Sequence, residues 1–233
     1  MIQLGKQLAT VPAFIGTFLS MLVLLASTAV SAESGAASSG PHALVADTTE
    51  RVMRVVTAAE EYANEDPERY YGEIQGILDP LIDYRGFARN VMGPYASSKR
   101  YRSLDEAGRE QLKSQLNTFT LAMQQSLIRT YSKGLLAFGQ ARIELAMEES
   151  EEASAKRASV KQLIYAENPQ PYVVLYQMGR NKADAWKLRN VIIESVNLGE
   201  IYRDQFLASA RDFDGDLDKV ISNWTTVTVD VES

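Results

Sequence analysis

The fold is decided by residues 109–138, which read REQLKSQLNTFTLAMQQSLIRTYSKGLLAF. Apolar side chains recur there at every third or fourth position, the spacing that aligns them along one face of a helix. The positions between them carry mostly Gln, Ser, Thr, Lys and Arg, so the opposite face can meet water. The pattern predicts a helix of about 30 residues, roughly 45 Å long, against which the other elements pack. The residues of its apolar face are Leu112, Leu116, Phe119, Met123, Leu127, Tyr131, Leu135 and Phe138.

Shorter helical patterns precede this long helix. Residues 44–64 repeat apolar side chains at helical spacing, and Pro67 suits the first turn of a second helix. Asp83 is a typical cap for a third, short helix, which Gly93-Pro94 ends. These signals predict a helical N-terminal segment.

The start of the long helix carries its own signal. Ser103 followed by Glu106 matches a capping box, in which the two side chains bond each other's backbone N–H groups. We therefore expect Ser103 to open the helix and residues 97–103 (SSKRYRS) to form a basic loop before it.

The pattern changes from helix to strand after Phe138. Four segments rich in Val, Ile, Leu and Tyr predict strands, and the short joins between them favour an antiparallel meander. The third segment is apolar on both faces, so we expect it to be covered on both sides or to face a cavity. Helical patterns resume after the fourth. The strand segments are residues 141–147, 160–166, 171–178 and 185–196, and the later helices are residues 198–211 and 217–224.

The N-terminus has the features of a secretory signal. Lys6 precedes an uncharged apolar run at residues 13–26, and residues 27–32 (STAVSA) place small side chains where a signal peptidase cleaves. We expect residues 1–32 to be a signal peptide cleaved after Ala32, because the apolar run is short for a membrane span.

Four regions follow from this organisation. After the signal peptide, residues 33–43 form a small, polar and flexible lead, and residues 225–233 form a loose tail. Between them we expect one domain, residues 44–224, which folds outside the cytoplasm. The fold class is α+β: helical N-terminal and C-terminal segments packed on a four-stranded antiparallel sheet, with an apolar cavity between sheet and helices.

Charge and composition exclude several classes of function. The formal net charge is −6, and removal of a leader whose only charged side chain is Lys6 makes the remainder more acidic. Such a chain is a poor candidate for binding nucleic acid, where phosphate contacts supply most of the affinity. The chain has no cysteine and a single histidine, so thiol catalysis and histidine-based triads are excluded and zinc sites are poorly supplied.

Two acidic features remain as candidates for chemistry. Residues 212–218 (DFDGDLD) resemble a calcium loop, but their glycine comes fourth rather than sixth, so a helix-capping loop is the better interpretation. Asp79, Asp83 and Glu194 are carboxylates flanked by apolar residues and could act as acids or bases in a pocket. A structural role for them, in a cap or an ion pair, is the simpler hypothesis.

Three segments resemble one known family. Residues 77–95 (ILDPLIDYRGFARNVMGPY) are similar to its I-L-x-P-x-x-D…V-x-G signature, and residues 111–135 resemble its long helix. Residues 186–206 (WKLRNVIIESVNLGEIYRDQF) are similar to its W-x-V-x-x-V…G-V-S-L…Y-R-x-x-F segment, whose end is matched by residues 202–206. Together they resemble the MlaC-type, toluene-tolerance family of periplasmic phospholipid-binding proteins, and the likeness covers residues 44–224.

Two residues depart from the family pattern. Ser195 stands where the family usually has Gly, and Asn197 stands where it has Ser. Both lie in the turn after the fourth strand, so this turn is where the chain is expected to differ.

The resemblance implies a soluble carrier of lipid rather than an enzyme.

 The carrier would shuttle phospholipid between the outer and inner membranes of a Gram-negative cell and so maintain the lipid asymmetry of the outer membrane. Its partners would be an inner-membrane ABC transporter complex with a lipid-binding ring and an outer-membrane lipoprotein–porin complex. The resemblance implies a monomer with phospholipid as cargo and with no cofactor and no metal.

The family holds acyl chains between sheet and helices, with the head group near the mouth of the cavity. Apolar residues on the elements that would enclose such a cavity are the expected lining, and basic residues before the long helix are expected to contact the head group or a partner. The lining candidates are Leu78, Leu81, Phe87, Val91, Met92, Phe119, Met123, Leu127, Tyr131, Val174, Tyr176, Ile192 and Phe206, and the basic candidates are Lys99, Arg100 and Arg102.

Two other functions fit the same sequence. One is a small-molecule enzyme on a cone-shaped α+β fold that uses a buried carboxylate. The other is a non-lipid adaptor, in which the apolar faces close on each other without a cavity. A carboxylate inside a pocket would favour the enzyme, and the presence of a pocket between helices and sheet would disfavour the adaptor.

Overall fold

The computed structural model describes residues 40–136, 139, 141–146, 156–165 and 170–224. The predicted signal peptide, most of the predicted lead and the predicted tail lie outside these residues. Among the described residues, no helix combines the length and the apolar character that a bilayer crossing requires.

The elements are α1 (Pro41–Ala59), α2 (Pro67–Leu78), α3 (Tyr84–Met92), the 3-10 helix η1 (Gly93–Ala96), α4 (Ser98–Ser103), α5 (Glu106–Leu136), β1 (Arg142–Leu145), β2 (Arg157–Tyr165), β3 (Tyr172–Arg180), β4 (Trp186–Ile193), β5 (Val196–Asn197), α6 (Leu198–Asp212) and α7 (Leu217–Ser222).

Polar side chains define where the helices begin. The Asp66 and Asp83 carboxylates accept hydrogen bonds from backbone N–H groups in the first turns of α2 and α3. The cap at Asp83 is the one that the sequence predicts. The predicted cap of the long helix is wrong. Ser103 is the last residue of α4, and the Asp105 carboxylate instead accepts the N–H of Gly108, 2.8 Å away, at the start of α5.

Two segments are helical where the sequence predicts loop. The basic residues 97–103 were expected to form a loop, but Ser97 caps a short helix there by accepting the N–H of Arg100. The first helix begins at Pro41 rather than at Leu44. Proline suits that position because its missing N–H has no partner in a first turn.

The sheet is an antiparallel meander in the order β1-β2-β3-β4-β5, which confirms the predicted topology. It has five strands instead of four, because β5 adds two residues after a tight turn. Glu194 and Ser195 form that turn with positive φ values of 47° and 73°. A two-residue turn with this backbone matches the twist of the strands it joins, and glycine is favoured there.

The sheet is tied to the α2–α3 connection through β4. The N–H of Leu188 donates to the carbonyl of Leu81 at 2.9 Å, and its carbonyl accepts the N–H of Asp83 at 3.0 Å. The Asp83 carboxylate also pairs with the Arg189 guanidinium. Gly86 leaves room for this pair, since an added Cβ would lie 2.9 Å from Nη1 of Arg189. One carboxylate therefore caps α3 and holds the helix against the sheet.

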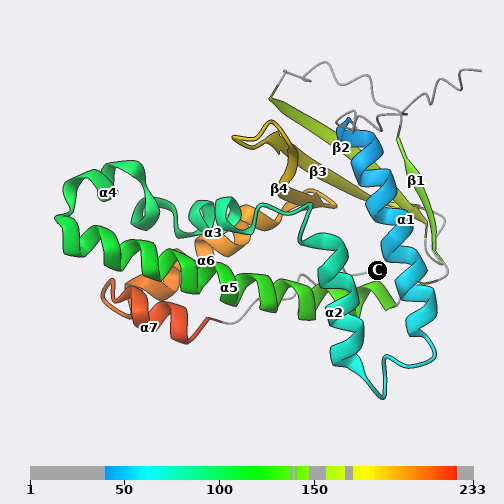
Figure 1. The fold of residues 1–233 in the computed structure, drawn as a ribbon, viewed down its shortest axis with the longest axis horizontal. Coiled ribbons are helices and arrows are strands. Elements are labelled where there is room, and N and C mark those ends of the chain that lie inside the picture. Colours follow the sequence, from blue (N-terminus) through cyan, green and yellow to red (C-terminus); the bar gives the residue numbers. More distant parts are fainter. Residues whose placement is uncertain (1–39, 137–138, 140, 147–155, 166–169, 225–233) are drawn as a thin grey trace, which may run out of the picture. The chain divides into compact units, whose positions relative to one another are not determined.

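Three apolar clusters make up the core. The helical cluster joins α3, α5, α6 and α7, and it includes Phe119 and Phe206. The α1–α2 cluster joins α1, α2 and the C-terminal half of α5, and it includes Tyr70 and Ile128. The sheet cluster joins Val45 of α1 to side chains of β2, β3 and β4. Figure 1 shows how α5 runs past both groups of helices, so one helix contributes to two clusters.

Candidate functional site

A pocket of about 870 Å³ lies between α1 and the β1–β2 side of the sheet; we call it the α1–sheet pocket. Its lining is mixed, with apolar side chains on both the helix and the strands and polar side chains along α1. The apolar lining residues are Ala46, Met53, Ala58, Ala141, Ile143 and Leu145. Because a polar and an apolar surface meet there, the pocket suits a ligand with both kinds of surface.

A chain of hydrogen bonds joins the sheet to α1 at this pocket. The Tyr176 hydroxyl donates to Oε1 of Gln162 at 2.7 Å, and Nε2 of Gln162 donates to Oγ1 of Thr49 at 2.9 Å. Gln162 is 2% exposed and lines the pocket. Burial raises the pKa of Tyr176, so its hydroxyl stays protonated and keeps its role as the donor. This chain satisfies polar groups that would be costly to bury alone.

A second pocket, of about 500 Å³, lies between α3, η1 and the start of α4, with one side chain from α6; we call it the α3–α6 pocket. Arg89 and Arg203 are its charged lining residues, and none of the lining residues in the described part of the chain is acidic. Backbone and small side chains supply most of the rest, including Gly86, Gly93 and Pro94. The local character is therefore positive, in contrast to the acidic chain as a whole.

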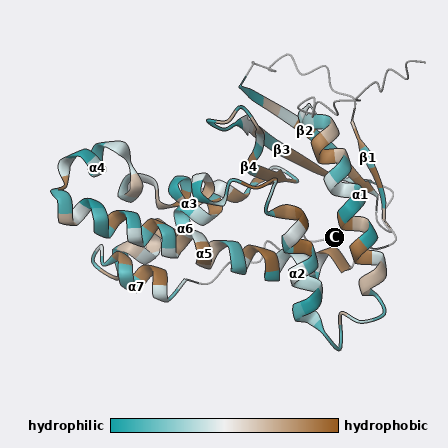
Figure 2. Cartoon of the chain, in the orientation of Figure 1, coloured by the Kyte–Doolittle hydropathy of each residue, from teal (hydrophilic) through white to brown (hydrophobic). Residues whose placement is uncertain are grey.

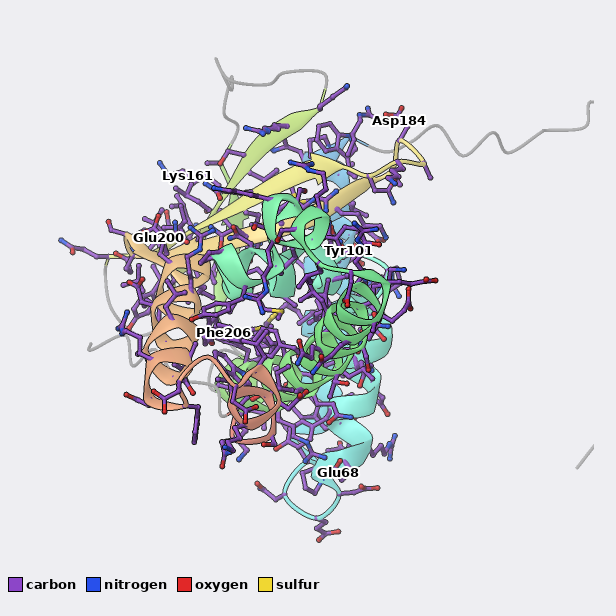
Figure 3. All side chains as sticks on the ribbon, turned by 90° about the vertical axis from the view of Figure 1, so that its left-hand side faces the viewer. Glu68, Tyr101, Lys161, Asp184, Glu200 and Phe206 are labelled. Carbon is purple, nitrogen blue, oxygen red and sulfur yellow. The ribbon has the colours of Figure 1, made fainter. Side chains whose placement is uncertain are left out.

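The predicted lining residues lie outside both pockets. Six are buried in the helical cluster, and two more are half-buried against it. Phe206 lies 4.9 Å from Phe119 between ring centroids, and Figure 3 shows its side chain between α6 and α5. The six are Phe87, Val91, Met92, Phe119, Met123 and Phe206, and the two are Leu127 and Tyr131.

The remaining lining candidates lie nearer the sheet. Leu81 and Tyr176 belong to the sheet cluster, and Leu78 packs against the α1–α2 cluster. Val174 is buried and Ile192 is half-buried, on strands that Figure 2 colours with a mixture of hydrophobic and hydrophilic residues. Tyr176 is linked to the α1–sheet pocket through its hydrogen bond to Gln162, which lines that pocket. The lining role of the set stays a prediction.

The predicted basic candidates lie on α4. Lys99, Arg100 and Arg102 are exposed, and the Arg100 guanidinium lies 5.5 Å from the centroid of the Tyr95 ring. The pocket beside them is lined instead by Arg89 and Arg203, which the sequence reading did not select. The sequence does contain a signal for Arg89. It lies in residues 84–104, a segment that carries Lys and Arg side chains but no Asp or Glu.

The carboxylates proposed for acid–base work have structural partners. Asp83 caps α3 and pairs with Arg189, and Asp79 accepts a 2.8 Å hydrogen bond from the Gln124 amide. Glu194 is exposed and accepts the N–H of Val173. None of the three lines either pocket, whereas the enzyme alternative called for a carboxylate inside a pocket.

The calcium-like segment has a structural role as well. The Asp216 carboxylate accepts the N–H of Lys219 at 3.2 Å, which caps α7. Hydrogen bonds from this backbone N–H and from the Lys219 side chain lower the pKa of Asp216. The described residues contain no group of three or more metal-ligating side chains. The helix-capping interpretation is therefore the one that the geometry supports.

Comparison with known proteins agrees with this fold. The family model described as "MlaC protein" matches residues 46–226. The chain is 29% identical over 188 residues to the toluene tolerance protein Ttg2D of Pseudomonas putida, and the match covers 81% of each chain. A phospholipid-binding protein from Ralstonia solanacearum, solved in complex with a phospholipid, has a similar fold with a TM-score of 0.57 and 15% identity. That likeness covers 78% of this chain and 96% of the other. The chain belongs to the MlaC family.

Proposed function

We propose that this protein is a phospholipid carrier that holds diacyl lipid in an apolar cavity and moves it between the outer and inner membranes. Membership of the MlaC family supports this function. The similar fold of the Ralstonia solanacearum protein, which was solved with a phospholipid bound, supports it further. Carriage of lipid would maintain the lipid asymmetry of the outer membrane.

The observation that carries the proposal is the α1–sheet pocket. Its volume of about 870 Å³ falls within the range of about 300–1,000 Å³ that is usual for ligand sites. Apolar side chains such as Met53, Ile143 and Leu145 line it and would contact hydrocarbon. A pocket at this place also disfavours an adaptor whose helices and sheet close on each other.

The energetics of hydrocarbon transfer suit a carrier. Burial of each CH₂ group gains about 0.8 kcal/mol, so two sixteen-carbon chains could gain upwards of ~20 kcal/mol before costs. That approaches the practical limit of non-covalent affinity, near −18 to −21 kcal/mol. Release into water would be negligible, so the lipid would leave only at a membrane or a partner protein, and no catalytic group is needed.

The cellular setting is part of the same proposal. The leader ending at Ala32 would direct the chain to the periplasm, where it would act as a monomer. An outer-membrane lipoprotein–porin complex would supply or receive lipid, and an inner-membrane ABC transporter complex with a lipid-binding ring would be the other partner. The thirteen side chains predicted from the sequence, from Leu78 to Phe206, are the competing place for the acyl chains, and a loss of lipid on substitution within that set would favour it over the α1–sheet pocket.

Lipid extraction tests the proposal directly. The full chain is produced with its leader in a Gram-negative host, purified without detergent and extracted with organic solvent for mass spectrometry. We expect diacyl phospholipid in near-stoichiometric amount. Protein that folds and carries no lipid would overturn the proposal.

Pocket-filling variants test the place of binding. Ala58 is exposed on α1 and lines the pocket, so Ala58→Trp fills space without disturbing buried packing. Ala107→Trp makes the same change at an exposed position of α5 and serves as the matched control. We expect lipid content to fall several-fold in the first variant and to stay unchanged in the second. Equal lipid content in both would move the acyl chains away from the α1–sheet pocket.

A further inference from the structure

The α3–α6 pocket contains two positive side chains without a negative partner. Arg89 on α3 is exposed and Arg203 on α6 is half-buried, and neither forms an ion pair with any residue that the structure describes. Like charges that share a pocket repel each other, and an anion between them would remove that repulsion. Among the residues that the structure describes, no acidic side chain lines the pocket to take that role.

Arg203 is held in a fixed orientation. Its Nε donates to the backbone carbonyl of Asn90 at 3.0 Å, and its Nη2 donates to the Asn90 side-chain oxygen. Both acceptors are neutral, so they position the guanidinium without neutralising it. The guanidinium has five N–H donors, so others are left for a ligand. A planar, oriented guanidinium is suited to bidentate contact with a phosphate.

The surroundings of the pocket are positive as well. Residues 84–104, which form α3, η1 and α4, contain five Lys and Arg side chains and no acidic residue, although the chain has a net charge of −6. Lys99, Arg100 and Arg102 of this segment are exposed on α4, next to Ser97 and Ser98 of the pocket. A local excess of one charge in a concave site concentrates ligands of the opposite charge.

We propose that the α3–α6 pocket is a subsite for a phosphate group, bound by Arg89 and Arg203 together. The phosphate belongs to a phospholipid head group or is free in solution, and the two sources share the chemistry that the arginines recognise. The head-group source rests on the proposed lipid-carrier function. Binding of free phosphate does not rest on it, so the two proposals can fail separately.

The test uses the full mature chain and two probes. Inorganic phosphate is titrated against ¹⁵N-labelled protein at constant ionic strength, with chloride as the reference anion. The second probe is short-chain phosphatidylglycerol below its micelle concentration. The arginine side-chain Nε–H signals are followed in the parent protein and in Arg89→Gln, Arg203→Gln and Arg211→Gln. Arg211 is an exposed arginine at the end of α6 that does not line the pocket, so its variant is the matched control.

We expect one or both probes to shift the Arg89 and Arg203 signals together, with affinity falling about tenfold or more in either pocket variant and unchanged in Arg211→Gln. A response to phosphatidylglycerol alone assigns the phosphate to a head group, and a response to both probes assigns a general phosphate subsite. If neither probe moves these signals beyond chloride, the proposal is overturned. Binding of a polyglutamate peptide by the same arginines, without a response to phosphate or lipid, would also overturn it in favour of an acidic protein partner.

Discussion

The helical cluster and the α1–sheet pocket differ in how completely their side chains pack. In the helical cluster, Phe119, Phe206 and Trp224 form edge-on and tilted contacts with ring centroids 4.9 to 6.0 Å apart, and Phe119 and Phe206 are fully buried. At the α1–sheet pocket, by contrast, a helix and two strands meet around about 870 Å³ of open space, and hydrogen bonds through Gln162 link them. The helical cluster is therefore held together by dispersion contacts between packed rings, whereas hydrogen bonds connect the walls of the α1–sheet pocket.

This difference separates stability from binding. Close packing of large rings supplies cohesion that does not depend on a ligand. A pocket wall held by a few hydrogen bonds leaves space that a ligand can enter. We therefore expect changes in the helical cluster to alter mainly the free energy of unfolding and changes at the pocket to alter mainly lipid content.

The largest effect is expected for Phe119→Ala. Removing a fully buried ring leaves a cavity among its aromatic neighbours and should lower the free energy of unfolding by about 3–5 kcal/mol. Chemical denaturation measures this loss, and mass spectrometry measures the lipid bound per folded molecule, which should not change. Leu121→Ala, at a 59% exposed position of the same helix, should cost under about 0.5 kcal/mol. A selective loss of lipid in Phe119→Ala would break the comparison and support a lining role for Phe119.

A smaller effect is expected for Gln162→Leu. The substitution keeps the approximate size of the side chain but leaves the buried Tyr176 hydroxyl without its acceptor, at a cost of about 1–3 kcal/mol. Adding Tyr176→Phe removes the unpaired hydroxyl and should recover much of that loss. A double-mutant cycle in urea measures the coupling between them. Additive effects would mean that the hydrogen bond contributes nothing to the pocket wall.

Tyr70→Phe tests the cluster between these two regions. The Tyr70 hydroxyl donates to the Ser132 carbonyl of α5 at 2.9 Å, and its loss should cost about 1 kcal/mol. Burial raises the pKa of Tyr70 from 10.0 to about 12. The unfolded state then loses its proton at lower pH than the folded state, so this contribution to stability is present below pH 10 and is lost as the pH rises towards 12.

Denaturation curves between pH 9 and 12 check this prediction. Tyr70→Phe should lose less stability over that interval than the parent protein does, because it lacks the hydroxyl whose pKa is raised in the folded state. Parallel curves for Tyr70→Phe and the parent would mean that the burial of this hydroxyl is not coupled to folding.

The smallest effect is a gain in stability for Ser195→Gly. Ser195 has a φ of 73° in the turn that leads from β4 to β5, a conformation that glycine adopts without steric cost. We expect the free energy of unfolding to rise by about 0.5–1 kcal/mol, with lipid content unchanged. Thermal denaturation followed by circular dichroism measures the gain. Ser209→Gly, inside α6, should instead destabilise the protein, and a loss in both variants would argue against the turn geometry.

The elements with a regular period were predicted well from the sequence. The three- and four-residue spacing from Leu112 to Leu135 predicted α5, and the runs rich in Val, Ile, Leu and Tyr with short joins between them predicted the meander. Asp83 predicted the start of α3 because capping is a local interaction. Ser103 failed as a cap because it is the last residue of α4, and α5 begins only after Asp105, whose carboxylate accepts the N–H of Gly108.

The site was predicted less well, for a physical reason. An apolar period shows which side chains leave water, but it does not show whether they meet each other or a ligand, so Phe119 and Met123 were chosen although they pack in the helical cluster. The α1–sheet pocket is lined partly by small and polar residues, such as Ala58 and Thr49. A sequence pattern assigns such residues to the solvent-exposed face of a helix. Arg203 lines the α3–α6 pocket only because the fold brings α6 against α3. Its hydrogen-bond partner there, Asn90, is more than a hundred residues away in the sequence.

The positions of the two tryptophans make the contrast between the regions measurable by fluorescence. Trp186 belongs to the sheet cluster, with the Arg180 guanidinium 4.6 Å from its ring centroid, whereas Trp224 packs on Phe119 and Tyr202 in the helical cluster. The chain has no other tryptophan. Replacing either one by Phe leaves a single emitter in the other region, so the emission of each variant reports on one region as lipid is added or withdrawn.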